Sequence, residues 1–158
     1  MAFAAVAVVG VTGGTAGAET RQAVPRPVTE SDQLAVQIRN QNGLCMDIGS
    51  NAPGTVVGMT YCNSGLLSQF WVFNGDNTVV NVNNGLCMDI GSNAPGTRVG
   101  ITTCHPGYTS QRWFNYSEDR SFRNYNGLCA DIGSNAPGTP VAVTTCQAGY
   151  LSQRWYFQ

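Results

Sequence analysis

The chain has 158 residues, its formal net charge is −1, and charged residues make up 11% of it. This length suits one domain. A chain so close to neutral has no basic patch for the phosphate neutralisation that drives nucleic-acid binding and no basic cluster for an anionic membrane surface, so nucleic acids are excluded as partners.

The first segment in chain order is an apolar run over residues 2–11, followed by small residues. This pattern is typical of a secretory leader and is too short to span a bilayer, so we predict a signal peptide over residues 1–18, export, and no membrane insertion. A basic start is missing, and we expect the true start codon upstream of Met1. The alternative is an apolar N-terminus without an export role. Residues 19–32 combine Pro and charge without periodicity and predict a linker, which leaves residues 33–158 as the domain.

The rest of the chain consists of three repeats with one period. The string NGLCMDIGSNAPGT starts at Asn42, recurs unchanged from Asn84 and recurs with one substitution from Asn126, a step of 42 residues. Such a register is typical of homologous units that pack together. The residues that keep this step are Cys45, Cys87 and Cys129; Cys62, Cys104 and Cys146; Gln69, Gln111 and Gln153; and Trp71, Trp113 and Trp155.

Six cysteines in a small exported chain indicate a disulfide framework, because disulfides persist in oxidising compartments. The repeat favours one bridge within each unit, since other schemes would break the equivalence of the units or join distant ones. Zinc is disfavoured, because His105 is the only histidine and no two cysteines have the close spacing of zinc ligands. We therefore expect no metal and no cofactor. The predicted bridges are Cys45–Cys62, Cys87–Cys104 and Cys129–Cys146.

The apolar stretches predict an all-β fold, because they are short, alternate with polar residues and are separated by Gly, Pro, Asn and Ser. In the first unit, the alternation from Leu44 to Ile48 puts these two residues and Met46 on a core face and Asp47 on an outer face. A turn is expected at residues 51–54, where Pro and Gly follow Asn and Ala.

A second strand should follow this turn. Because the Cys45–Cys62 bridge would turn the two cysteine faces to the same side, Asp47 should share an outer surface with Gly58 and Thr60. The core-facing residues of this strand would be Val57, Met59 and Tyr61, so Tyr61 is expected to point inward.

Each unit should supply about four short strands and the three units about twelve. In the first unit the last strand lies around residues 70–73 and carries Trp71 into the core, and Val79, Val80 and Val82 begin the next unit. A unit of this size cannot bury its own apolar face, so the units must pack together, and closure around a pseudo-threefold axis removes exposed sheet edges. The last strand of the chain is free to pair with the first, which supports closure.

Each unit contains C-x-D, a G-T turn, a second Cys and Q-x-W. This pattern resembles the ricin-B lectin family and the family-13 carbohydrate-binding modules, which are β-trefoils, and the match covers residues 33–158. The resemblance implies a β-trefoil of three 42-residue repeats with pseudo-threefold symmetry, the same disulfide pattern, and carbohydrate binding through shallow outer pockets without catalytic residues.

In that family the Asp after the first Cys accepts hydrogen bonds from two sugar hydroxyls, often with help from the Gln of Q-x-W and the residue before it. A carboxylate has several acceptor sites and an amide has both donor and acceptor, which suits vicinal hydroxyls. Two alternatives stay open: the Gln only fixes a backbone turn, or the Asp only caps the turn at residues 49–51. By resemblance, the carbohydrate-binding residues are Asp47, Asp89 and Asp131; Gln69, Gln111 and Gln153; and Ser68, Ser110 and Ser152.

The chain departs from the family where the family places a stacking aromatic residue, two positions before the second Cys, and a Gln two positions earlier. We expect Tyr108 and Tyr150, in the loops after the second cysteines, to replace the aromatic platform, whereas the first unit has Leu66 there. Units two and three should therefore bind sugar, and unit one weakly or not at all. The departures are Thr60, Thr102 and Thr144 at the aromatic position, and Gly58, Gly100 and Ala142 at the Gln position.

Two other function classes, an enzyme and a protein-binding domain, are the alternatives to a lectin. A glycoside hydrolase needs two carboxyl groups about 5–9.5 Å apart, whereas the repeat aspartates belong to different units. A Ser-His-Asp triad would depend on His105, in a loop and without a nucleophile-elbow sequence. We therefore predict no enzymatic activity. A protein-binding β-trefoil, such as an inhibitor or a targeting subunit of a complex, is the alternative, because a fold does not fix a function and the usual platform is missing.

Overall fold

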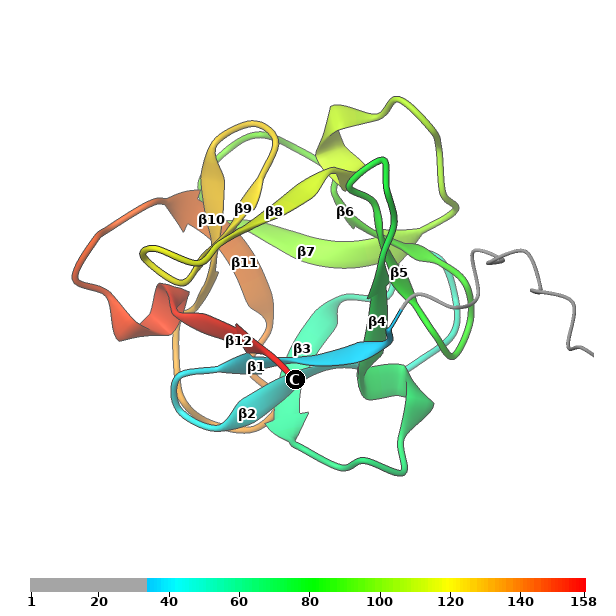
Figure 1. The fold of residues 1–158 in the computed structure, drawn as a ribbon, viewed down its shortest axis with the longest axis horizontal. Coiled ribbons are helices and arrows are strands. Elements are labelled where there is room, and N and C mark those ends of the chain that lie inside the picture. Colours follow the sequence, from blue (N-terminus) through cyan, green and yellow to red (C-terminus); the bar gives the residue numbers. More distant parts are fainter. Residues whose placement is uncertain (1–33) are drawn as a thin grey trace, which may run out of the picture.

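The computed structural model describes residues 34–158, so the predicted signal peptide and linker lie outside the described residues. This part of the chain forms twelve strands and three short 3-10 helices, which confirms the all-β prediction (Figure 1). None of these helices is long and apolar enough to cross a membrane. The strands are β1 (Val36–Asn40), β2 (Leu44–Ile48), β3 (Val57–Tyr61), β4 (Phe70–Phe73), β5 (Val79–Asn81), β6 (Cys87–Ile90), β7 (Thr97–Thr102), β8 (Trp113–Tyr116), β9 (Ser121–Asn124), β10 (Leu128–Ile132), β11 (Val141–Thr145) and β12 (Trp155–Phe157). The helices are η2 (Leu67–Gln69), η3 (Thr109–Gln111) and η4 (Leu151–Gln153).

Six strands close into a barrel. β1 pairs with β4 and with β12, β4 pairs with β5, and β8 pairs with β9. Two single hydrogen bonds complete the ring: the Trp113 amide donates to the Asn77 carbonyl at 2.9 Å, next to β5, and the Trp155 amide donates to the Arg120 carbonyl at 2.8 Å, next to β9. The pairing of β12 with β1 confirms that the last strand closes onto the first.

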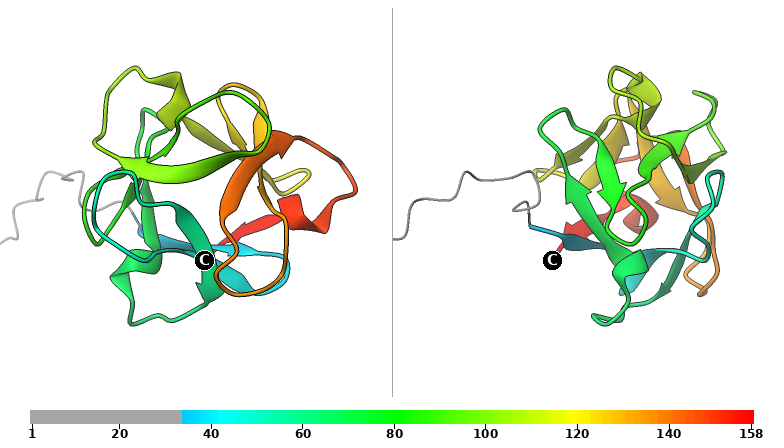
Figure 2. Two further views of the ribbon diagram at one scale, coloured as in Figure 1. Left: turned by 180° about the vertical axis from the view of Figure 1, so that it is seen from behind. Right: turned by 90° about the vertical axis from the view of Figure 1, so that its right-hand side faces the viewer.

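The other six strands form three hairpins, β2–β3, β6–β7 and β10–β11. They lie behind the barrel in Figure 1 and in front of it in the left view of Figure 2, one in each repeat. Lobe 1 (β1–β4), lobe 2 (β5–β8) and lobe 3 (β9–β12) therefore surround one pseudo-threefold axis. This arrangement is the β-trefoil that the resemblance implies.

The hairpin register agrees with the predicted faces. In lobe 1, Asp47 lies opposite Gly58 and Cys45 lies opposite Thr60, so Asp47, Gly58 and Thr60 share the outer face. The disulfides hold the ends of each hairpin together across a separation of 17 residues. They are the predicted bridges Cys45–Cys62, Cys87–Cys104 and Cys129–Cys146.

The prediction that Tyr61 points inward is wrong, because its side chain is 72% exposed. Val57 and Met59, the two preceding residues on the same face, are buried as predicted. Alternation along a strand gives the side on which a residue lies, but not whether the core extends that far. Tyr61 is the last residue of β3, and the core ends before it.

The core is filled from the inner faces of all three lobes. Trp71, Trp113 and Trp155 are at most 1% exposed, so these three residues belong to the core as expected. Phe73, Phe122 and Phe157 pack edge-to-face, with ring centroids 5.3–6.0 Å apart. Aromatic residues of this size each remove a large apolar area from water, which stabilises the closed barrel.

Each GSNAPGT segment forms a tight turn with a glycine at its third position. In lobe 1 the Thr55 amide donates to the Ala52 carbonyl at 3.1 Å, and Gly54 has a φ of +89°. A turn with Pro second and a positive φ third is a type II turn, in which glycine is favoured because it has no Cβ.

These turns also join the lobes. The amide of the turn glycine donates to a strand carbonyl of the next lobe, and the turn of lobe 3 reaches back to lobe 1, so the contacts form a ring around the axis (Figure 2, left). The identity of GSNAPGT in all three repeats therefore has a structural cause. The bonds run from Gly54 to Ile101 (2.7 Å), from Gly96 to Val143 (2.7 Å) and from Gly138 to Met59 (2.6 Å).

We expect Gly96→Ala to lower the free energy of unfolding by about 1–2 kcal/mol, because the φ of +90° at Gly96 strains any residue with a Cβ. Gly91→Ala is the matched control in the same loop: a Cβ there meets no atom within 4 Å, and its φ is not positive. Urea unfolding followed by tryptophan fluorescence measures both variants. Equal loss in the two would contradict the role given to the turn.

Candidate functional site

In every lobe the repeat aspartate is bound by the glutamine of Q-x-W. The amide nitrogen Nε2 donates to Asp Oδ2 at 3.0 Å in lobe 1, 2.9 Å in lobe 2 and 2.8 Å in lobe 3. The glutamines are at most 1% exposed, and the aspartates are half-buried. In each lobe the buried glutamine therefore fixes the orientation of the half-buried aspartate. The pairs are Asp47–Gln69, Asp89–Gln111 and Asp131–Gln153.

Each glutamine also hydrogen-bonds to the backbone on both sides of the second Cys. In lobe 3, Gln153 Oε1 accepts from the Gln147 amide at 2.7 Å, and Nε2 also donates to the Thr145 carbonyl at 3.1 Å. Lobes 1 and 2 repeat these bonds. The structure thus agrees with the alternative in which the glutamine fixes the backbone, and it shows in addition that the glutamine orients the aspartate.

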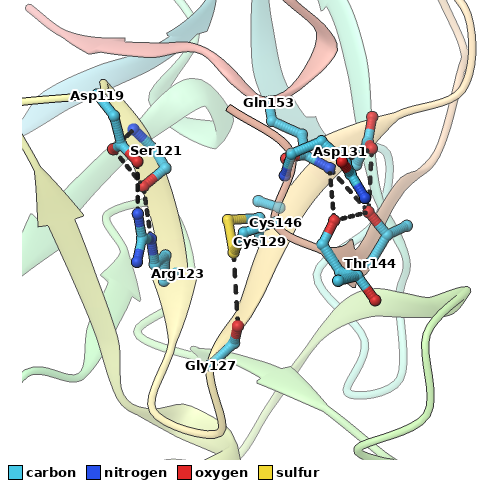
Figure 3. Close-up of a disulfide and its surroundings, with 12 residues drawn as sticks. Asp119, Ser121, Arg123, Gly127, Cys129, Asp131, Thr144, Cys146 and Gln153 are labelled. Atoms are coloured by element: carbon cyan, nitrogen blue, oxygen red, sulfur yellow. Dashed lines mark hydrogen bonds and ion pairs between the residues drawn. A yellow bond between two sulfur atoms is a disulfide. The ribbon is translucent and has the colours of Figure 1, made fainter. Parts of the chain in front are cut away.

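Lobe 3 differs from the other two lobes in the hydrogen bonds of its repeat aspartate. Thr144 Oγ1 donates to Asp131 Oδ2 at 3.1 Å and accepts from Gln153 Nε2 at 2.9 Å (Figure 3). In lobes 1 and 2 the second carboxylate oxygen, Oδ1 of Asp47 and of Asp89, is buried and has no hydrogen-bond partner. Among the described residues, Asp131 has no such buried, unpartnered oxygen.

Asp131 lines a hollow of about 420 Å³ at the edge of lobe 3. Tyr150 and Ser152, two of the predicted site residues, line the same hollow, and the Tyr150 ring is 57% exposed. Asn42 and Asn135 form another wall and bond to each other through their side-chain amides. A carboxylate, a phenol ring, a hydroxyl and two amides therefore meet around one open space.

Asp47 and Asp89 line smaller hollows of about 310 and 320 Å³, which are equivalent by repeat position. Each lies over a hairpin and is bounded on one side by the turn of a neighbouring lobe. Thr60 and Thr102 stand at the position where the family has its aromatic residue. No aromatic side chain lines either hollow.

The predicted tyrosine of lobe 2 lies apart from its aspartate. Tyr108 stacks on His105 with ring centroids 4.8 Å apart, and neither Tyr108 nor Ser110 lines the hollow of Asp89. In lobe 1, Leu66 is exposed, and Ser68 does not line the hollow of Asp47. The structure therefore brings the predicted residues together fully only in lobe 3.

A further small hollow of about 130 Å³ borders the Cys129–Cys146 bridge and is lined by Asp119 and Arg123 among others. Figure 3 shows these two side chains beside the bridge. Ser121 Oγ donates to Asp119 Oδ1 at 2.6 Å, and Arg123 pairs with Asp119 Oδ2 at 2.5 Å. The hydroxyl of Ser121 first, and then Arg123, hold the pKa of Asp119 below its usual value. The hydrogen bonds of this carboxylate are therefore satisfied by its own neighbours.

Sequence reasoning missed the asparagines. The Asn42–Asn135 pair that walls the lobe 3 hollow recurs at equivalent positions as Asn126–Asn93, whereas in lobe 2 the partner of Asn51 is Asn83, one residue before the shared string; each pair joins the turn of one lobe to the next lobe. The signal was present in the sequence, because Asn42 and Asn135 belong to the strings that the three repeats share. It did not allow the pair to be predicted, because an internal sequence repeat does not show which repeats contact one another in the folded protein.

Solved structures share this fold at low sequence identity. The designed threefold-symmetric protein ThreeFoil is 20% identical with a TM-score of 0.69, and the match covers 78% of this chain and 96% of that one. The C-half of the earthworm R-type lectin in complex with GalNAc is 14% identical with a TM-score of 0.66, covering 78% and 97%. A non-toxic homologue of type II RIPs from Momordica charantia (bitter gourd), in complex with α-methyl-D-galactoside, is 23% identical with a TM-score of 0.70, covering 79% and 47%.

No curated protein sequence matches the chain. The ricin-type β-trefoil lectin domain matches residues 34–155, well over half of the chain. These residues contain all three C-x-D and Q-x-W motifs and all three disulfides. The chain therefore belongs to the family of ricin-type β-trefoil lectin domains.

Proposed function

We propose that this protein is a secreted, non-enzymatic lectin domain that recognises the hydroxyls of glycans or polysaccharides in shallow outer pockets, and that lobe 3 carries its principal pocket. The observation that supports this most directly is the meeting of Asp131, Tyr150 and Ser152 at one open hollow. The family to which the chain belongs supports carbohydrate as the ligand class.

The chemistry of the lobe 3 hollow suits a pyranose. Gln153 and Thr144 fix Asp131, so the carboxylate is oriented before a ligand arrives, which lowers the entropy lost on binding. The carboxylate accepts hydrogen bonds from vicinal hydroxyls, and the exposed Tyr150 ring offers a flat apolar face. In this proposal Gln153 acts through Asp131, since its own polar atoms are already bonded to the protein.

The hollows of Asp47 and Asp89 are subsidiary sites in this proposal, because they lack an aromatic wall. Single shallow sites of this kind bind weakly, with Kd values of about a millimolar, and several sites on one domain gain avidity on a polymer with repeated epitopes. Export is part of the proposal and is supported by the three disulfides, which persist in oxidising compartments.

Protein binding is the second candidate, and lobe 1 favours it. Tyr61, Leu66 and Leu67 are 72%, 45% and 56% exposed and belong to one short stretch of the chain, residues 61–67. Exposed apolar side chains that gather in one region are typical of contact surfaces. A stable protein partner without any glycan binding would favour this candidate over the lectin.

We expect Tyr150→Ala to weaken glycan binding at least tenfold while leaving the fold intact, because the ring is exposed and its loss removes only the apolar wall. Asp131→Asn should weaken binding by a similar factor. The measurement is a glycan array, followed by titration of galactose and N-acetylgalactosamine, the sugar classes bound to the two natural relatives. Asp47→Asn is the matched control, since lobe 1 has no aromatic wall. A larger loss in Asp47→Asn than in Asp131→Asn would contradict the assignment to lobe 3.

A further inference from the structure

Two of the hollows form a natural matched pair. Each is lined by the repeat aspartate and by glycines and a threonine at equivalent positions, with the turn glycine of a neighbouring lobe at the edge. Within the hairpins the two sets differ at two positions, where Arg98 and Ile101 in lobe 2 replace Val56 and Met59 in lobe 1, and Val56 also lines the lobe 2 hollow from the neighbouring lobe. Only the change at Arg98 introduces a charge.

The strand geometry directs Arg98 toward the hollow. Gly100 lies opposite Asp89 in the hairpin, and Arg98 lies two residues before it on the same outer face, about 7 Å along the strand. The inner face of β7 carries the buried residues Val99 and Ile101. Asp89 and Arg98 therefore project from one surface, one pleat apart.

Three of the residues that line the hollow, Gly54, Gly91 and Gly100, are glycines, which helps to keep it open. A Cβ added at Gly54 or Gly91 would meet no atom within 4 Å, whereas one at Gly100 would come within 3.2 Å of the Thr55 carbonyl oxygen. Glycine at position 100 therefore follows from the close crossing of the lobe 1 turn. Asp89 and Arg98 both line the resulting space.

Both charged groups have unused capacity. Asp89 lines the hollow, but its unpartnered Oδ1 is buried, so a ligand hydroxyl reaches this oxygen only after the carboxylate turns toward the hollow. In the part of the chain that the structure describes, Arg98 takes part in no ion pair and donates no side-chain hydrogen bond. Arg98 is exposed, and the other residues that line the hollow with these two are uncharged.

From this arrangement we propose that lobe 2 binds sugar units that carry an anionic group, with the anion on Arg98 and ring hydroxyls on Asp89. The proposal rests on carbohydrate binding as the proposed function and adds a ligand class to one lobe. A guanidinium binds a carboxylate through two parallel hydrogen bonds, so a uronic acid fits best, and a sulfate ester has the same charge. Lobe 1, with Val56 in place of Arg98, has no group for such an anion.

The test uses four probes and the whole protein. Polymers of galacturonic and of glucuronic acid supply carboxylates, their methyl esters supply the same backbones without charge, a sulfated galactan supplies sulfate esters, and neutral galactose measures the lobe 3 site. Arg98→Val should weaken binding of the uronate polymers about tenfold and leave binding of the methyl esters and of galactose unchanged. Val56→Arg should strengthen uronate binding, because Val56 lines both the lobe 1 and the lobe 2 hollow and an arginine there adds a positive charge beside each repeat aspartate.

Arg120→Gln controls for net charge, since it removes one exposed positive charge in lobe 3. An equal loss in Arg98→Val and Arg120→Gln would overturn the proposal in favour of nonspecific attraction, as would equal binding of Arg98→Val and wild type to every charged polymer. A loss confined to the sulfated galactan would support an anionic sugar and identify the anion as sulfate. If the protein binds galactose but Arg98→Val changes the binding of none of the charged polymers, the proposed function stands and only this inference is withdrawn. Absence of binding to every probe would remove both.

Discussion

Reduction of the three disulfides is expected to unfold the domain in a mild reducing buffer at room temperature. Each bridge closes a loop with a sequence separation of 17, and a loop of this size is worth about 3 kcal/mol in the chain-entropy account. Three such contributions, about 9 kcal/mol in total, are comparable with the entire net stability of a domain, which is about 5–15 kcal/mol. Tryptophan fluorescence and near-ultraviolet circular dichroism, with and without reductant, measure the loss.

A single-bridge variant separates this effect from damage by the reductant. Replacing Cys87 and Cys104 together by Ala should cost about 3 kcal/mol in urea unfolding and leave a folded domain. Cys87 is buried and Cys104 is half-buried, so a small cavity adds to the cost at one end only. A fully reduced, thiol-blocked chain whose melting temperature stays within a few degrees of the oxidised chain would show that packing alone holds the trefoil.

The repeat made the fold predictable to an unusual depth. One period of 42 residues related the cysteines, and equivalence of the units then favoured the pairing that the structure contains. Alternation within Leu44–Ile48 placed Asp47 outward, and the bridge to Cys62 placed Gly58 beside it. These inferences succeeded because they concern neighbours within one hairpin, where strand geometry and a covalent bond determine the outcome.

The contacts between lobes could not be predicted from the sequence. Gly96 donates to Val143 of the next lobe, and Asn42 bonds to Asn135 across 93 positions. Three identical repeats do not show whether a turn reaches forward, backward or into solvent, so the ring of turns and the walls of the hollows appear only in three dimensions. The same limit explains why Tyr61 was placed in the core: the direction of a side chain is local, whereas the edge of the core depends on all three lobes.

The candidate site, too, could be predicted from the sequence only in part. The resemblance named Asp131 and Ser152, Tyr150 was expected to replace the aromatic residue that the family has, and the structure brings these three to one hollow. Tyr108 was expected to do the same in lobe 2, but it lies on His105 and does not line the hollow of Asp89. The loops after the second cysteines differ in sequence, and the direction of a loop side chain depends on such local packing. Lobes that descend from one unit have therefore acquired different surroundings for the same carboxylate.

Gln153→Leu is expected to lower the free energy of unfolding by about 3 kcal/mol, because it removes the donor to Asp131 Oδ2 and leaves the Gln147 amide and the Thr145 carbonyl without their side-chain partner. Gln153→Glu has almost the same shape and tests the electrostatic part of this explanation. It places a second carboxyl beside Asp131 in a position that is 1% exposed in the native protein, and burial and like charge both raise a carboxyl pKa.

A carboxyl whose pKa is raised on folding destabilises the folded state progressively as the pH rises through its unfolded value, which is about 4.3 for Glu. The stability of Gln153→Glu relative to wild type should therefore be lowest at pH 7 and should recover as the pH falls toward 4, whereas the deficit of Gln153→Leu should show no comparable recovery. Urea unfolding at a series of pH values measures both curves. Parallel curves for the two variants would mean that Gln153 serves only as packing, and the orientation of Asp131 by its amide would have to be abandoned.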